Sequence, residues 1–282
     1  MRVTITGASG LIGSKLVTAL RERGDEVTTV SLRNGPPDPA DLAGRDAIVH
    51  LAGENVAQRW SEDARRRIRE SRELGTRQLI NAIAQADPKP RALISSSAVG
   101  YYGPHGDELL DEQTPPGHDF LAEVCVIWER EAEKAAELGL RVVKVRTGVV
   151  LDADGGALSK MLLPFKLGGG GPVAGGRQYM PWIHVDDVVG IYLRAIDDPA
   201  WDGAVNATAP DPVTNRTFSK ALGKALHRPA VAPIPGAAIR LLYGDMAEIV
   251  TKGQRVIPKR TVELGYTYQH ADLDEALEAA VG

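Results

Sequence analysis

The first thirteen residues, Met1-Arg-Val-Thr-Ile-Thr-Gly7-Ala-Ser-Gly10-Leu-Ile-Gly13, decide the fold. Apolar residues alternate with threonines before Gly7, which is typical of a strand, and an apolar-periodic helix follows the glycines. Gly7 permits a tight turn, Gly10 lets backbone N–H groups approach a pyrophosphate, and Gly13 lets the helix lie close to the strand. The spacing G-x-x-G-x-x-G differs from the commonest fingerprint, but its place between a strand and a helix predicts a dinucleotide-binding loop.

Strand-like and helix-like stretches alternate along the chain. Apolar runs at 26–32, 46–53, 91–97 and 141–151 are typical of buried strands, and helical periodicity recurs over 10–23, 61–84, 119–136 and 187–197. This alternation predicts an α/β fold with a doubly wound, Rossmann-type parallel sheet and a smaller C-terminal substrate-covering domain. We expect 1–155 and about 183–207 to form the Rossmann domain, and about 156–182 and 208–282 the smaller domain. The glycine-rich stretch 152–176 is interpreted as a mobile loop over the pocket mouth, or as a plain linker.

Composition excludes several classes of protein. The net charge of −4 gives no electrostatic reason to expect a nucleic-acid partner. The single cysteine, Cys125, excludes an intrachain disulfide framework and suits a reducing compartment. No apolar run is long enough to span a bilayer, and the N-terminus enters a strand directly, so we expect no membrane partner and a cytoplasmic location. No cluster of metal ligands is evident, and we expect a monomer or homodimer.

The end of the second strand predicts the choice of cofactor. An acidic residue there would favour NAD(H) through the ribose 2′-hydroxyl, but Ser31 and Arg33 stand in its place. Because a guanidinium can pair with a 2′-phosphate, we expect NADP(H) to be preferred over NAD(H). The alternative is that Arg33 is one of many solvated loop arginines. The residues expected to bind the cofactor are Gly7, Ser9, Gly10, Leu11, Ile12, Gly13, Ser31, Arg33, Leu51, Ala52, Gly53, Ser95 and Arg146.

Several longer motifs resemble a known family. They are His50-Leu-Ala-Gly-Glu54, Ser95-Ser-Ser-Ala-Val-Gly-Tyr-Tyr-Gly103, Gly175-Gly-Arg-Gln-Tyr-Met-Pro-Trp-Ile-His184, Asn206-Ala-Thr-Ala-Pro210 and Arg255-Val-Ile-Pro-Lys259. Together with the glycine loop they resemble the extended short-chain dehydrogenase/reductase superfamily, the NAD(P)-dependent nucleotide-sugar epimerases and dehydratases. More narrowly, they look like an epimerase-like subfamily of largely unassigned activity with a C-terminal domain of unknown function.

The resemblance implies a catalytic pair that this chain lacks. The superfamily uses Tyr-x-x-x-Lys on one helix face, where the tyrosine transfers a proton and the lysine lowers its pKa. None of the seven tyrosines is followed by lysine at that spacing. Spacing from Ser97 puts Leu121 and Cys125 at the two positions. Ser97 carries over the superfamily's catalytic serine, and Tyr101 and Tyr102 either bring a phenol from the other side or pack beneath the ligand.

A second departure concerns the substrate. The nucleotide-sugar enzymes hold the nucleotide phosphates with an arginine at the position of Met180, so UDP-sugar recognition is not expected unless Arg177 compensates. We also expect a substrate pocket. The alternative for Cys125 is an inert, buried thiol, and the alternative for His184 is a histidine whose hydrogen bonds serve the structure alone. The residues expected to line this pocket are Glu54, Trp60, Arg72, Cys125, Arg177, Trp182 and His184.

Two functions follow from these patterns. The first is an NADP(H)-binding, epimerase-like oxidoreductase of unknown small-molecule substrate, with an atypical active site in which Ser97, Tyr101 or Tyr102, and His184 face the nicotinamide. The second is a non-catalytic, dinucleotide-binding protein that acts as a redox-responsive regulator or partner. The glycine loop supports cofactor binding in both cases.

Overall fold

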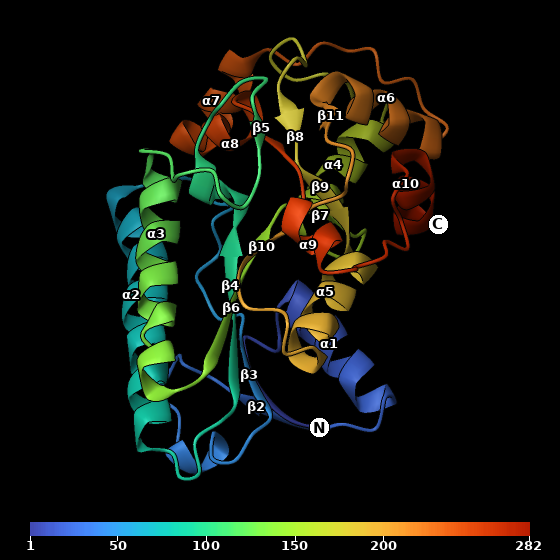
Figure 1. Cartoon of the computed structure of the whole chain (residues 1–282). Helices are drawn as coiled ribbons and strands as arrows, with labels where there is room; N and C mark the ends of the chain where they lie inside the picture. The colour runs from blue at the N-terminus through green and yellow to red at the C-terminus, as the bar shows by residue number, and fades with distance from the viewer.

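A six-stranded parallel sheet lies at the centre of the computed structural model, which describes residues 1–282 (Figure 1). Its strand order is β10-β6-β4-β3-β1-β2, so the chain moves outward from β1 in both directions, and the predicted doubly wound sheet is confirmed. The strands are β1 (Arg2–Thr6), β2 (Glu26–Val30), β3 (Ala47–His50), β4 (Ala92–Ala98), β6 (Arg141–Thr147) and β10 (Gly203–Ala207).

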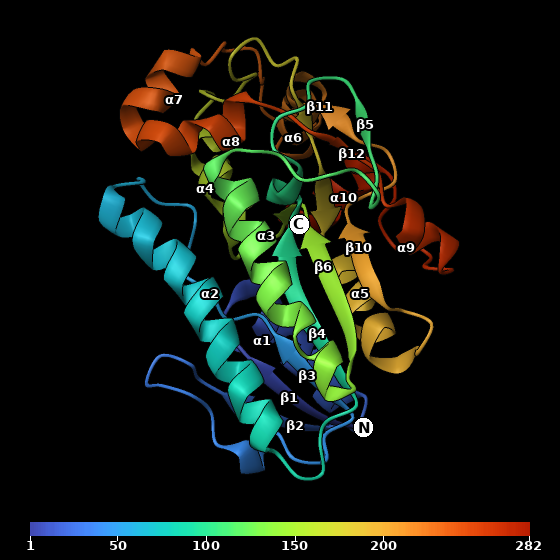
Figure 2. The same ribbon diagram turned by 60° about the vertical axis from the view of Figure 1, so that its left-hand side comes forward.

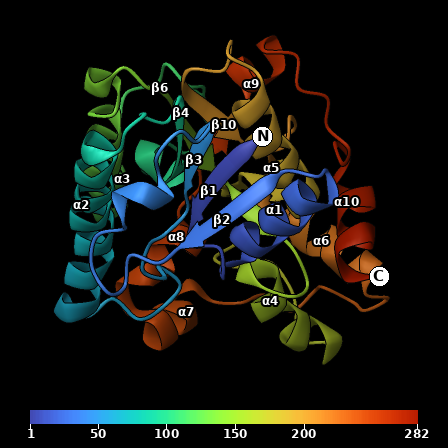
Figure 3. The same cartoon turned by 90° about the horizontal axis from the view of Figure 1, so that it is seen from below.

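Two pairs of helices cover the faces of this sheet. On one face lie α1 (Leu11–Glu22) and α5 (Val185–Asp197), and on the other lie α2 (Glu62–Gln85) and α3 (Phe120–Glu133) (Figures 2 and 3). A buried cluster that includes Val3, Ile5 and Ile191 fills the first interface, and one that includes Leu79, Leu93 and Val142 fills the second. Because both faces are covered, the central strands are apolar almost throughout, as their sequences indicate.

A smaller lobe lies beyond the carboxyl ends of the strands. Its core joins residues around Leu158, Trp182, Phe218 and Leu277, which come from segments on both sides of β10. It contains the strand pairs β7 (Val149–Leu151) with β9 (Trp182–His184) and β8 (Tyr179–Met180) with β11 (Val213–Thr214). Its helices are α4 (Gly156–Lys166), α6 (Asn215–Ala225), α7 (Gly236–Tyr243), α8 (Ala247–Thr251) and α10 (Leu273–Val281). The domain boundaries given above stay predictions.

The C-terminal tail also returns to the sheet. Strand β12 (Arg255–Val256) pairs with β5 (Leu109–Leu110), and α9 (Lys259–Glu263) packs near β10. The remaining short helices are η1 (Pro39–Asp41), η2 (Val99–Tyr102), η3 (Ala136–Leu138) and η4 (Gly244–Met246). The segment that contains β5 and the C-terminal tail, which are distant in sequence, therefore meet above the carboxyl ends of the strands.

The prediction of a loop over 152–176 is wrong for its first half, where α4 forms. Leu158 is fully buried and Phe165 nearly so, so burial of one helix face stabilises this segment despite Pro164. The run of four glycines begins only at Gly168, after the helix has ended. The high glycine content of the whole stretch led to the loop prediction, although the apolar residues of its first part have helical spacing.

A buried histidine joins β1, β3 and α2 at the edge of the sheet. Thr6 Oγ1 lies 2.7 Å from His50 Nδ1, and Thr76 Oγ1 lies 2.9 Å from His50 Nε2. Desolvation, with a smaller contribution from the positive charge of Arg72, lowers the pKa of His50 to about 4. The neutral imidazole therefore holds the end of β3, from which Leu51, Ala52 and Gly53 continue.

A buried carboxylate attaches the C-terminal tail to α5. The Asp187 side chain is fully buried and accepts hydrogen bonds from the backbone N–H groups of Gln269 (2.8 Å) and His270 (3.0 Å). The Tyr266 hydroxyl donates to the same carboxylate at 3.1 Å. Three donors from one segment thus converge on one charge, which fixes the tail against the N-terminal end of α5.

We expect Asp187→Asn to lower the free energy of unfolding by about 3 kcal/mol, because the amide NH2 would face one of these backbone donors and leave it unpaired. Urea unfolding measures the change. Asp186→Asn is the matched control: its carboxyl is half-exposed at the same helix end, so a loss well below about 1 kcal/mol is expected. Equal losses in the two variants would contradict the tethering role of Asp187.

We expect acid to destabilise the protein through His50. Its pKa is lower in the folded than in the unfolded chain, so its contribution is present above about pH 6.5 and is lost as the pH falls toward about 4. Between pH 7 and pH 5 this loss is about 2 kcal/mol for a shift of this size. Urea unfolding of wild type and His50→Gln at both pH values measures it. The same pH dependence in both proteins would contradict the assignment.

Candidate cofactor and substrate site

The glycine loop has the close contacts that its sequence predicts. Gly7 has a φ of +74°, and a Cβ there would lie 2.6 Å from the carbonyl carbon of Leu51. A Cβ on Gly13 would collide with the carbonyl oxygen of Gly7. Gly10 caps α1, and its N–H donates to Gly7 O at 3.0 Å. The start of α1 therefore lies directly on the ends of β1 and β3, with its free N–H groups at the edge of the sheet.

A cavity of about 790 Å³ adjoins this loop and is called the loop cavity here. It brings together the glycine loop, the end of β2 and the residues after β3, and α2 forms its far wall. Of the expected cofactor residues, the structure places Gly7, Ser9, Gly10, Ser31, Arg33, Leu51, Ala52 and Gly53 in its lining, together with Glu54. Arg67 of α2 also lines it, and its guanidinium pairs with Asp63. The loop cavity thus brings the Arg33 guanidinium and the glycine loop to the same edge of the sheet.

A second cavity of about 520 Å³ lies at the carboxyl ends of β4 and β6, beneath the smaller lobe. We call it the aromatic cavity, because Trp60, Phe120 and Trp128 form part of its largely apolar wall. Trp60, Arg72 and Cys125, which the sequence assigns to the substrate pocket, all line it. Glu54 lines the loop cavity instead.

The two residues at the positions of the missing pair also line the aromatic cavity. Leu121 and Cys125 lie one turn apart on α3 and face Gly100, where a Cβ would lie 3.3 Å from Leu121 Cβ and 3.8 Å from Cys125 Sγ. Burial raises the pKa of the Cys125 thiol to about 12, and the nearby Glu129 carboxylate adds to the shift. The thiol is therefore neutral at physiological pH and lacks the charge of the lysine that it replaces.

Ser97, Tyr102 and Arg146 line neither the loop cavity nor the aromatic cavity and belong to a buried polar network. Arg146 Nε and Nη2 donate to the two carboxylate oxygens of Glu129 at 2.8 and 2.9 Å, and Ser97 Oγ donates to Glu129 Oε1 at 2.7 Å. The Tyr102 hydroxyl donates to Asn206 Oδ1 at 2.6 Å and accepts from Arg146 Nη1 at 3.1 Å. Desolvation raises the pKa of Tyr102 above its usual range, so its proton is held firmly.

This placement does not support the catalytic roles expected of Ser97, Tyr101 and Tyr102, nor a cofactor contact for Arg146. Tyr101 stacks on the Arg146 guanidinium, with Cζ 3.5 Å from the ring centroid, and so belongs to the same cluster. The Ser97 and Tyr102 hydroxyls and the Arg146 guanidinium are already engaged in hydrogen bonds within the protein. These residues instead join β4, β6 and β10 to α3, and the sequence gives no sign of Glu129 as their shared partner.

Three expected pocket residues lie elsewhere. Trp182 is buried in the core of the smaller lobe, and its indole N–H donates to Asp211 O at 3.3 Å. Arg177 is exposed and lines none of the cavities described here, so it does not compensate for Met180, which does line the aromatic cavity. His184 is buried, and its Nδ1 accepts the backbone N–H of Asp186 at 3.2 Å as the N-cap of α5.

His184 belongs to a cluster that sequence reasoning missed. Asp186 Oδ2 lies 3.5 Å from both His184 Nδ1 and His270 Nε2, and the two imidazole centroids are 3.9 Å apart. These three groups are close enough to share a cation. The Nδ1 lone pair of His184 already accepts the N–H of Asp186 at the start of α5, so this hydrogen bond competes with a metal that would bind through Nδ1.

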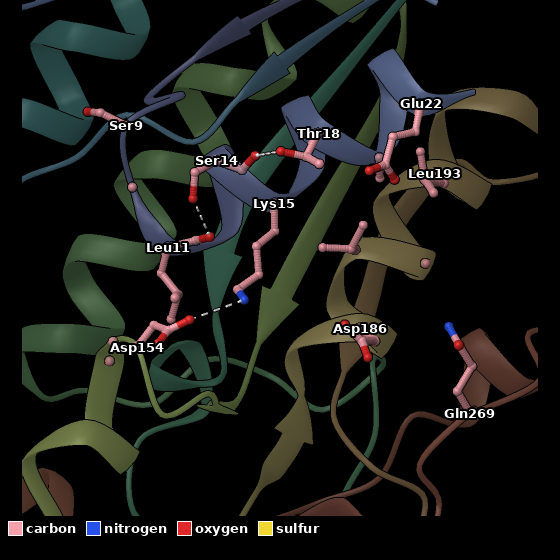
Figure 4. Close-up of a pocket in the computed structure, with 16 residues that line it drawn as sticks. Ser9, Leu11, Ser14, Lys15, Thr18, Glu22, Asp154, Asp186, Leu193 and Gln269 are labelled. Carbon is pink, nitrogen blue, oxygen red and sulfur yellow. Dashed lines mark hydrogen bonds and ion pairs between the residues drawn. The ribbon is translucent and has the colours of Figure 1, made fainter. Parts of the chain in front are cut away.

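An open groove of about 970 Å³ lies on the outer side of α1 and α5, on the other side of the glycine loop (Figure 4). Leu11, which the sequence assigns to the cofactor, lines it together with Ser9 and Gly10. Lys15 in its lining lies 3.9 Å from Asp154 and 2.8 Å from Asp152, which is outside the lining. The side chains of Ser14 and Thr18 donate to backbone carbonyls of α1. The side chains of Lys15, Ser14 and Thr18 are thus already engaged within the protein.

Ile12, Gly13 and Ser95 complete the expected cofactor residues. They line none of these cavities: Ile12 packs against the core beneath α1, Gly13 is the close contact described above, and Ser95 is buried in β4, with its hydroxyl donating to Ser96 O at 3.2 Å. Conversely, the aromatic cavity contains Thr147, Tyr179, Lys252 and Gln254, which sequence reasoning did not identify. Lys252 and Gln254 come from the C-terminal tail, and no local motif indicates that the tail reaches the sheet.

The sequence matches known families and proteins over nearly its whole length. Residues 3–207 match the model of the NAD dependent epimerase/dehydratase family, and residues 234–280 match a domain of unknown function, DUF1731. The mouse epimerase family protein SDR39U1 is 40% identical over the full length of both chains. A chloroplastic SDR39U1 homolog of Arabidopsis thaliana is 37% identical over 99% of this chain and 86% of its own length.

A solved structure extends the comparison to three dimensions. The human epimerase family protein SDR39U1 (isoform 2), crystallised with NADPH, has a TM-score of 0.92 and 38% identity, and the match covers 99% of each chain. None of the helices of the present chain is long and apolar enough to cross a membrane. The glycine loop, the parallel sheet and these matches together show that the chain belongs to the NAD dependent epimerase/dehydratase family, in the SDR39U1-like group with a C-terminal DUF1731 domain.

Proposed function

We propose that this protein is an NADP(H)-dependent oxidoreductase that transfers hydride between the nicotinamide and a small molecule in the aromatic cavity. The observation that carries the proposal is that the two cavities meet at Gly53 and Arg72. Gly53 lines the loop cavity, and a Cβ on it would lie 3.2 Å from Cζ of Arg72, which lines the aromatic cavity. A dinucleotide with its phosphates on the glycine loop would reach this junction with its nicotinamide end.

The preference for NADP(H) is supported by the charges around the loop cavity. Ser31 and Arg33 follow β2, where an acidic residue would favour the ribose 2′-hydroxyl of NAD(H). Arg33 has no ion-pair partner in the protein and is exposed, so its guanidinium is free to pair with a 2′-phosphate. The presence of NADPH in the human SDR39U1 crystal structure supports the same assignment.

The reacting groups differ from those expected from the sequence. Tyr179 is the one tyrosine that lines the aromatic cavity, so it is the phenol available to a bound substrate. Bound NADPH would supply the hydride. Around it, Leu121 and the neutral Cys125 exclude water and contribute no charge, while Arg72 provides a positive charge from α2.

The second candidate is a protein that binds NADP(H) without turnover, as a redox-responsive regulator. The absence of Tyr-x-x-x-Lys from α3 favours it. Oxidation of NADPH with a panel of carbonyl and quinone substrates separates the two: binding without any oxidation supports the regulator.

We also propose a cytoplasmic location and a monomer or homodimer without a nucleic-acid partner, supported by the single buried, unpaired Cys125 and the net charge of −4.

We expect Arg33→Ala to weaken NADPH binding by at least about tenfold, because a charge-assisted pair with the 2′-phosphate would be lost. NADH binding should change by less than about twofold. Titration with each nucleotide, followed by fluorescence enhancement, measures both. Arg91→Ala is the matched control, since Arg91 is exposed and lies before β4 at the opposite end of the sheet. Equal affinity of the wild type for NADPH and NADH would refute the preference.

A further inference from the structure

We propose that the aromatic cavity takes a mostly apolar molecule that carries a single anionic group, and that Arg72 pairs with that group. This inference rests on the proposed function, because it names the substrate class of the same site. It follows from three features of the cavity: the pairing of its charged side chains, the surroundings of Arg72, and the chemistry of its walls.

Arg72 is the one cation in the lining without a carboxylate partner. Arg65 Nη2 lies 2.8 Å from Asp245, and Lys252 Nζ lies 3.1 Å from Glu248, so these four charges compensate one another. Asp119, the remaining charged residue of the lining, accepts the N–H of Ala122 at 2.9 Å and caps α3, where the helix end favours a negative charge. Asp119 is thus engaged at the start of α3, and Arg72 is left as the cation of the cavity that no carboxylate pairs with.

The surroundings of Arg72 hold the guanidinium in place but do not neutralise it. Nη1 donates to the backbone carbonyls of Glu54 at 3.0 Å and Ile68 at 3.2 Å, and the Trp128 ring lies 4.9 Å from Cζ. Neither Nε nor Nη2 donates a hydrogen bond within the protein. The Glu54 carboxylate is turned away, with Oε1 3.0 Å from Gln58 Nε2 and 3.6 Å from Arg67 Nε.

A guanidinium that is largely buried and has no carboxylate partner favours an anionic ligand. Desolvation lowers the pKa of Arg72, and the Glu54 carboxylate offsets this only in part, so the guanidinium loses hydration without gaining a paired anion. An arginine that retains free donors can form two parallel hydrogen bonds to a carboxylate or a similar oxyanion. The anion would supply the counter-charge that the protein does not.

The walls of the cavity define the rest of the molecule. Trp60 and Phe120 meet edge to face at a centroid distance of 5.2 Å, and Leu121, Val124 and Met161 add aliphatic surface. Such a surface suits a planar, apolar body better than a sugar rich in hydroxyl groups. A nucleoside diphosphate would also need cations for two phosphates, whereas Met180 lines the cavity and Arg177 lies outside it. One anion on an apolar frame fits the single free cation.

Two fluorescent dyes test this directly. Anilinonaphthalene sulfonate carries one anionic group on an aromatic frame, and phenylnaphthylamine has the same rings without the sulfonate. Titrated into the full-length protein saturated with NADPH, the sulfonate should bind at least about tenfold more tightly than the neutral dye. Equal affinities, or tighter binding of the neutral dye, would overturn the proposal.

Variants assign the difference to Arg72. Arg72→Met should weaken binding of the sulfonate by at least about tenfold and leave the neutral dye within about twofold, because the apolar wall remains. Arg72→Lys, which keeps the charge, should retain most of the preference and guards against misfolding of the methionine variant. Arg69→Met is the matched control on the exposed face of α2, and it should change neither affinity. Equal weakening of both dyes by Arg72→Met alone would contradict the pairing.

Cofactor binding separates this proposal from the one on which it rests. If the wild type does not bind NADPH but the dye preference and its dependence on Arg72 persist without cofactor, the oxidoreductase assignment fails and the anion site stands. If NADPH binds and Arg72→Met weakens NADPH while leaving the sulfonate unchanged, Arg72 belongs to the cofactor and the anion site is refuted.

Discussion

The ion pair between Arg146 and Glu129 is the interaction on which the carboxyl end of the sheet depends. It joins the last residues of β6 to α3, with both oxygens of the carboxylate engaged at 2.8 and 2.9 Å. Such a pair is costly to bury, and it is tolerated only where further hydrogen bonds satisfy both partners. Ser97 from β4 and Tyr102 beyond it provide them. The position of α3, and with it Leu121 and Cys125, follows from this arrangement.

The same hydrogen-bond network also fixes the position of the C-terminal tail. Asn206 on β10 accepts from Tyr102 and donates through Nδ2 to Ile257 O at 2.9 Å. Glu112 accepts from the N–H groups of Asn206 and Arg260 at 2.9 and 3.1 Å. These bonds hold the tail above the sheet, where Lys252 and Gln254 complete the aromatic cavity. A structural network of the Rossmann part therefore positions the lobe that covers the proposed substrate.

Because these buried polar residues hold the structure together, a reaction would have to use other side chains. Ser97 and Tyr102, which were expected to react, are hydrogen-bonded in a buried network, and Tyr101 stacks on Arg146 in the same cluster. At the positions of the missing pair, α3 presents a leucine and a neutral thiol. The free positive charge lies instead on α2, at Arg72, between the ends of β3 and α3. The glycine loop of the family is thus retained, while the unpaired cation of the proposed site comes from α2 and not from α3.

The sequence by itself determined the parts of the protein that are set by local patterns. The glycine loop, the apolar strands and the helices at 11–22, 62–85 and 120–133 could be predicted, because turn geometry and burial on two faces leave a periodic signal in the chain. Gly7, Gly10 and Arg33 could be placed beside one cavity for the same reason, since successive parallel strands end at one edge. The helix α4 was not predicted, because it lies within a glycine-rich stretch.

Tertiary structure alone decided which polar side chains pair: Glu129 with Arg146, Asp187 with the tail, and Arg72 with no carboxylate at all. Those partners are far apart in sequence, and a charge has no periodicity that shows whether it is compensated.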